Sequence, residues 1–213
     1  MLPTLLSVAL LSSVVVDRDN VEVRESCRII IPAGRIIDAD GNGVIHVTGN
    51  DIVVRLDDAH LHGAPEGAEP DQFSGIGIRV TGRNVTLIGG RISGFRVGIH
   101  ALEADGLVIH GADVSHNFAQ RLRSTPQAED GGDWLWPHKN DGGEWARNYG
   151  AGICIERSRG VAVRSCRARG TQNGLILDRV SVSRIYGSDF SFLSGWGIAL
   201  WRSSGHNISR NAL

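Results

Sequence analysis

The sequence repeats one short pattern six times, and this repetition constrains the fold more than any other feature. Each repeat places a glycine before an apolar residue and then alternates residue character with a period of two. The repeats span residues 41–49, 74–82, 96–104, 150–158, 172–180 and 195–203. From Gly152 to Gly174 the interval is 22 residues. A fixed period of this length indicates a solenoid, whose units bury their apolar faces only against their neighbours.

The composition of the repeat favours strands over helices. Its apolar runs are rich in Val and Ile and alternate with a period of two, which is typical of half-buried β-strands. Glycine, asparagine and serine stand at the corners between these runs. A coil of three short strands fits about 22 residues at ~3.3 Å per residue. We therefore predict about six or seven such coils, stacked in parallel with ~4.8 Å between rungs.

With this repeat, the chain resembles the right-handed parallel β-helix proteins of the pectate-lyase-like superfamily, over roughly residues 27–213. It also resembles the repeats of periplasmic NosD-like proteins. The resemblance implies an all-β, single-stranded right-handed parallel β-helix that acts on or binds polysaccharides. It is weak for function, because this fold carries many activities. The polygalacturonase NTD, GHG and RIK motifs and the epimerase DPHE motif are absent from the sequence.

Length and composition narrow the class of protein. A chain of 213 residues with a formal charge of −1 fits one domain and lacks the basic excess of nucleic-acid-binding proteins. The longest apolar runs are too short for a membrane span. Three cysteines argue against a disulfide framework. Residues 1–16 are either a signal peptide or an N-terminal cap on the parallel β-helix domain, which spans residues 17–213. A signal peptide would predict a secreted or periplasmic protein.

The C-terminal coil has no cap in the sequence. A solenoid needs a cap or a partner over its last apolar layer. We therefore expect either a longer β-helix, truncated here at its C-terminus, or an oligomer formed through this coil.

Alignment of the coils predicts which side chains stack on one another. Ile99, Ile153 and Leu175 fall in one inward column. Glu156 and Asp178 fall in an outward column on adjacent rungs, and each is followed by an arginine, Arg157 or Arg179. Paired carboxylates ~5–5.5 Å apart suit a retaining glycosidase, and such a pair can also bind Ca²⁺. The alternative is a solvated ladder in which the arginines neutralise the acids.

A long insertion interrupts the repeat at residues 117–149. Long loops inside compact domains are usually functional or disordered, and the aromatic content of this one argues against disorder. It contains Trp134, Trp136 and Trp145 together with several acids and arginines. Two hypotheses remain open and are compatible. The tryptophans cover apolar surface on the side of the solenoid, or they form a groove wall that stacks on sugar rings.

These features together predict a polysaccharide-processing site, lyase-like or hydrolase-like, beside the insertion. The expected catalytic residues are Glu156, Asp178 and Arg179. The expected substrate-binding residues are Trp134, Trp136, His138, Tyr149, Arg157, Trp201 and Arg202. No cofactor is predicted beyond a possible Ca²⁺, and the expected partner is a glycan.

The alternative functions are a non-catalytic glycan-binding protein and a purely structural surface solenoid. A further histidine pair, His60 and His62, lies at spacing i, i+2 and could bind a metal. Because no third ligand is adjacent, we expect this pair to be solvated.

Overall fold

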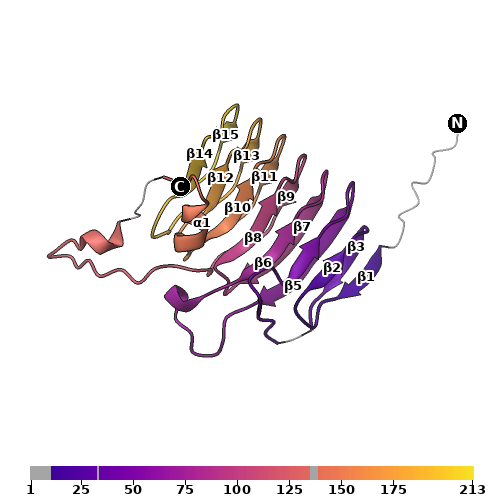
Figure 1. The fold of residues 1–213 in the computed structure, drawn as a ribbon, viewed down its shortest axis with the longest axis horizontal. Coiled ribbons are helices and arrows are strands. Elements are labelled where there is room, and N and C mark those ends of the chain that lie inside the picture. The colour runs from indigo at the N-terminus through magenta and orange to yellow at the C-terminus, as the bar shows by residue number, and fades with distance from the viewer. Residues whose placement is uncertain (1–10, 33, 135–138) are drawn as a thin grey trace, which may run out of the picture.

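Fifteen short strands form two parallel sheets in the computed structural model, which describes residues 11–32, 34–134 and 139–213. Strands of the two sheets alternate along the chain, so each coil contributes one strand to each sheet (Figure 1). The eight-stranded sheet contains β1 (Ser12–Val15), β3 (Cys27–Ile30), β5 (Val53–His62), β7 (Thr86–Ser93), β9 (Val108–His110), β11 (Ala162–Arg164), β13 (Arg184–Tyr186) and β15 (Asn207–Ser209). The seven-stranded sheet contains β2 (Val21–Val23), β4 (Ile45–Val47), β6 (Ile76–Val80), β8 (Val97–Leu102), β10 (Ala151–Glu156), β12 (Leu175–Asp178) and β14 (Ile198–Trp201). This is the predicted parallel β-helix.

The predicted register is confirmed along the seven-stranded sheet. Ile153 pairs with Ile99 on one side and with Leu175 on the other. All three side chains are buried to at least 99% and belong to one continuous core between the sheets. Glu156 and Asp178 are likewise register partners on β10 and β12. The two-residue alternation therefore placed both the inward and the outward columns correctly.

The third side differs from the expectation of three strands in most coils. β5 and β7 continue onto this side and pair residues 60–62 with residues 91–93. From β7 onward the third side is held by single parallel bridges rather than by a sheet. These bridges join Arg91 to Asp113, Asp113 to Arg167, and Arg167 to Asp189.

The repeated glycine is explained by the close approach of neighbouring rungs. A Cβ atom added to Gly98 would lie 2.7 Å from the carbonyl oxygen of Gly152. Gly174 lies on the rung after that of Gly152, and a Cβ atom added to it would lie 2.6 Å from the carbonyl oxygen of Gly197. Both distances are shorter than real Cβ contacts, so this position accepts only a residue without a side chain.

The insertion has structure of its own. Its first part extends away from the stacked rungs and includes the short 3₁₀ helix η2 (Gly131–Asp133) (Figure 1). Its last part forms the helix α1 (Glu144–Tyr149), which buries Trp145 and Tyr149. A smaller insertion, at residues 64–74, contains another 3₁₀ helix, η1 (Pro70–Gln72), and buries Phe73 against Phe118.

The N-terminal segment enters the eight-stranded sheet at β1. Ser12–Val15 pairs in parallel with β3, while residues 1–10 of the proposed signal peptide or cap lie outside the described residues. Cys27, Cys154 and Cys166 are free cysteines, and all three are buried, which the sequence did not predict. In the described ranges no helix has both the length and the apolar character that a membrane crossing requires.

Candidate functional site

A pocket of about 490 Å³ lies between α1 and the outer face of the seven-stranded sheet. Strands β6, β8 and β10 supply one wall, and the turn before α1 together with α1 itself supplies the other. Four arginines line it: Arg96, Arg147, Arg157 and Arg179. The acidic residues in its lining are Glu156 and Asp141. The four arginines and two acids give the lining a formal charge of +2.

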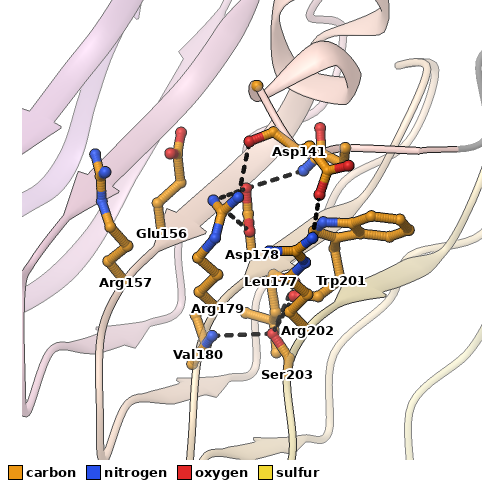
Figure 2. Close-up of polar contacts among 12 residues, drawn as sticks. Asp141, Glu156, Arg157, Leu177, Asp178, Arg179, Val180, Trp201, Arg202 and Ser203 are labelled. Atoms are coloured by element: carbon orange, nitrogen blue, oxygen red, sulfur yellow. Dashed lines mark hydrogen bonds and ion pairs between the residues drawn. The ribbon is translucent and has the colours of Figure 1, made fainter.

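The pocket exists because the insertion is fastened to the sheet by polar contacts. Asn140 donates a hydrogen bond from Nδ2 to Asp178 Oδ2 (3.0 Å), and its Oδ1 accepts one from the backbone N–H of Trp145 (2.7 Å). Asp141 pairs through Oδ1 with Arg202 (2.6 Å), and its carbonyl oxygen accepts a hydrogen bond from Arg179 (2.7 Å) (Figure 2). These contacts place the turn before α1 directly over the ends of β12 and β14.

Trp145 provides the apolar part of the same attachment. Its indole packs in a cluster with Cys154, Ile176 and Ala199, which point outward from β10, β12 and β14. The rings of Trp196 and Trp201 lie 4.7 and 5.5 Å from it, centroid to centroid. Outward-facing residues of three rungs are therefore buried, because the insertion covers them. Of the two hypotheses for the tryptophans, the structure places Trp145 in the covering role.

Glu156 faces the pocket from the end of β10. Its Oε1 lies 2.8 Å from Nε2 of His100 on the neighbouring rung. This hydrogen bond holds the pKa of the Glu156 carboxyl below its ordinary value; burial opposes the shift, while Arg157 and Arg179 reinforce it. Glu156 is therefore a carboxylate at neutral pH, as a general base requires.

Asp178 lies on the next rung but in a different environment. Only 1% of its surface is exposed, it does not line the pocket, and its carboxylate accepts hydrogen bonds from Arg179 (3.1 Å) and Asn140. Burial raises the pKa of its carboxyl, Arg179 opposes this, and the negative charge of Glu156 adds to it. Both hydrogen bonds end on Oδ2, whereas Oδ1 lies 3.1 Å from Nη1 of Arg179 without accepting a hydrogen bond.

The other predicted site residues are dispersed. Arg157 and Arg179 line the pocket, whereas Arg202 lies beyond it, paired with Asp141. Tyr149 is buried, Trp201 packs against Trp145, and Trp134 is 61% exposed on the outer part of the insertion. None of these three lines the pocket. Trp136 and His138 lie outside the described residues.

The predicted site residues did not include five residues of the site: His100, Arg96, Asn140, Asp141 and Arg147. His100 could have been found, because the coil alignment places it directly beside Cys154, its register partner. Arg96 stands at the corner before β8, and its Nη1 donates to the carbonyl oxygens of Arg147 and Asn148. Asn140 lies in the aperiodic insertion, where no sequence pattern indicates a contact.

The His60 and His62 pair is not simply solvated as expected. Nε2 of His60 and Nδ1 of His62 both lie within hydrogen-bond distance of the Ser93 hydroxyl, at 2.9 and 3.0 Å. Since one hydroxyl can donate only one proton, at least one imidazole donates to it and the tautomers are coupled. This arrangement anchors β5 to β7.

Comparisons with known proteins assign no family. No protein-family model matches the chain, and no solved structure matches it. A phosphoglucosamine mutase from Clavibacter michiganensis subsp. michiganensis (strain NCPPB 382) is 33% identical over 114 residues. The match covers 45% of this chain and 25% of that enzyme. At a quarter of the relative's length, the likeness carries no conclusion about activity, and function has to be argued from the site.

Proposed function

We propose that this chain is a polysaccharide-processing protein that binds an acidic glycan in the arginine-lined pocket under α1. The observation that carries the proposal is the set of four arginines around one pocket with a net positive lining. Guanidinium groups bind carboxylates through paired, charge-assisted hydrogen bonds, which suit the uronate residues of acidic polysaccharides. The pocket walls also include Ile76 and Val97, which offer apolar contact to the C–H faces of a sugar ring.

The disposition of the carboxylates favours a lyase over a hydrolase. A retaining hydrolase needs two carboxylates at the substrate, ~5–5.5 Å apart. Here Asp178 is buried outside the pocket, and Asp141 is paired with Arg202. One base among several arginines suits β-elimination instead. Glu156 would remove the proton α to the uronate carboxylate, and the arginines would stabilise the negative charge that develops. The glycosidic C–O bond at the β carbon would then break, and the departing oxygen would take up a proton from water.

Binding is tested by calorimetric titration with a galacturonate oligosaccharide. Arg157 is the best residue to change, because it is exposed and its removal leaves no buried charge unpaired. We expect Arg157→Gln to lower affinity by about tenfold or more, which corresponds to ~1.4 kcal/mol. Arg184→Gln, on the exposed face of β13, is the matched control and should bind as the parent does. The same oligosaccharide with its carboxylates methyl-esterified should bind weakly to both.

Turnover is tested with the same substrate. β-Elimination leaves a C=C bond conjugated to the carboxylate, which is followed by ultraviolet absorbance, whereas hydrolysis produces only new reducing ends. We expect the unsaturated product from the parent chain and none from Glu156→Gln, with binding retained. Binding without any product would favour the alternative, a non-catalytic glycan-binding protein. Absence of binding would favour a structural solenoid. Export and an oligomer formed through the last coil stay predictions.

A further inference from the structure

Three side chains with metal-ligating atoms converge at the base of the pocket. His100 and Cys154 are register partners on β8 and β10, and Glu156 follows Cys154 by two residues on the same face of β10. Nε2 of His100, Sγ of Cys154 and a carboxylate oxygen of Glu156 all lie within 4.8 Å of one another. Their backbones belong to paired strands in the middle of a sheet, which holds the three groups in fixed positions.

From this arrangement we infer that His100, Cys154 and Glu156 form a binding site for a borderline-soft divalent metal of the Zn²⁺ type. Two distances between ligand atoms are near those found around a bound metal. Nε2 of His100 lies 2.8 Å from Oε1 of Glu156, and Sγ of Cys154 lies 3.9 Å from the same oxygen. Tetrahedral zinc with bonds of 2.0–2.3 Å separates its ligand atoms by about 3.3–3.8 Å. Side-chain shifts of about 1 Å or less would complete this geometry.

The choice of metal follows from the ligand types. Imidazole and thiolate select zinc and similar transition metals, whereas calcium and magnesium require several oxygen ligands. The group contains a single carboxylate and so offers too few oxygens for calcium. Three protein ligands leave a fourth position, and His100 and Glu156 both line the pocket, so that position is accessible from it.

The charges of the three ligands favour metal binding at this buried site, whereas the protonated thiol and the nearby arginines oppose it. A thiolate, a carboxylate and a neutral imidazole around a divalent cation sum to zero net charge, which suits a site where Cys154 is 1% exposed. Burial raises the pKa of the Cys154 thiol well above its ordinary range, and the negative charge of Glu156 adds to this, so the metal must displace a bound proton. Arg157 and Arg179 at the pocket wall also weaken cation binding.

The inference goes beyond the proposed function but shares Glu156 with it, since a Glu156 oxygen bound to a metal is not free to remove a proton. The metal site is tested without any glycan, so that its failure is distinguishable from failure of the proposed function. The probe is Co²⁺, which replaces Zn²⁺ in tetrahedral sites and gives a thiolate-to-metal charge-transfer band. We expect the band to saturate at one Co²⁺ per chain and to disappear on addition of one equivalent of Zn²⁺. Excess Ca²⁺ should leave it unchanged. Absence of the band in the parent chain, or its loss to Ca²⁺, would overturn the inference.

Variants locate the metal. Cys154→Ser should abolish the charge-transfer band, while Cys166→Ser, which changes an equally buried thiol outside the group, should retain it. His100→Gln and Glu156→Gln keep the thiol and should each lower Co²⁺ affinity by about tenfold or more. Should Cys154→Ser fail to fold, as judged by circular dichroism, these two variants decide the matter. Parent-like affinity in both, or a band that persists in folded Cys154→Ser, would contradict the assignment.

Discussion

Two carboxylates on neighbouring rungs acquire different properties from their surroundings. Glu156 meets His100 and the pocket, whereas Asp178 is covered by the insertion and meets Arg179 and Asn140. The pKa of Glu156 is lowered and that of Asp178 is raised. A carboxyl with a raised pKa stabilises the fold when it is protonated, and this contribution is lost as the pH rises through its folded-state pKa. Ionised Asp178 therefore carries a net desolvation cost at neutral pH.

This cost leads to a prediction about substitutions of Asp178. Asp178→Asn keeps an oxygen that accepts from Asn140 and removes the buried charge, so the free energy of unfolding should stay equal to that of the parent chain or rise. Asp178→Ala leaves the Asn140 amide without its acceptor and should lower that free energy by ~1–3 kcal/mol. Urea denaturation of both variants at neutral pH makes the comparison. Equal destabilisation by the two changes would show that the charge itself stabilises the fold.

A second residue-level prediction concerns pH. Desolvation lowers the pKa values of His60 and His62 below 6.5, with neighbouring positive charge from Arg91 and Arg35 acting in the same direction. Asp113 opposes the shift at His60. The unfolded chain therefore binds protons more readily, and stability should fall as the pH drops below about 6.5.

The measurement is the melting temperature between pH 7.5 and pH 5.5. Replacing both histidines, His60→Gln with His62→Gln, should reduce the loss of stability on acidification without removing it, since the pKa of His206 is lowered as well. If the melting temperature of the double variant depends on pH as that of the parent does, protonation of His60 and His62 does not cause the loss of stability in this range.

At the scale of elements, α1 controls the outer face of the seven-stranded sheet. Trp145 covers Cys154, Ile176 and Ala199, and its loss should release the insertion while the coils beneath stay folded. We expect Trp145→Ala to make Cys154 reactive toward a thiol reagent and the 117–149 segment sensitive to protease. Cys166, in the core between the two sheets, should stay protected from the reagent and serves as the control. A Cys154 that stays unreactive in this variant would show that α1 does not depend on the indole.

The strands of the two sheets and the position of the insertion could be predicted from the sequence, but the contacts of the insertion could not. A period of 22 residues and a two-residue alternation determine which atoms of β10 and β12 stack, so the Ile153 and Glu156 columns followed directly. The 117–149 segment has no period, and its contacts depend on three-dimensional complementarity between Trp145 and a patch assembled from three rungs. The direction of the Glu156 side chain, toward His100 and away from β12, depends on rotamer choice, which backbone register does not fix.

For the whole molecule, stability is distributed along the stack because each coil is held by its neighbours. Ile153 and Leu177 are fully buried, with 0% of their surface exposed. Changing either to Asp would bury an unpaired charge, which costs several kcal/mol of stability and should unfold the adjacent coils. Arg184→Asp, at an exposed position of β13, should leave the fold intact. Hydrogen exchange of each variant reports the extent of the damage. Soluble, cooperative folding of either core variant would place that residue outside the interior.

The central claim is that the pocket under α1 holds the carboxylate of an acidic sugar. A crystal structure of the chain with a bound galacturonate oligosaccharide tests it most directly. We predict a uronate carboxylate within ~3 Å of a guanidinium nitrogen of Arg157 or Arg179, with α1 in place over β10 and β12. A sugar bound elsewhere, for example stacked on the exposed Trp134, with the arginine pocket empty, would contradict the claim.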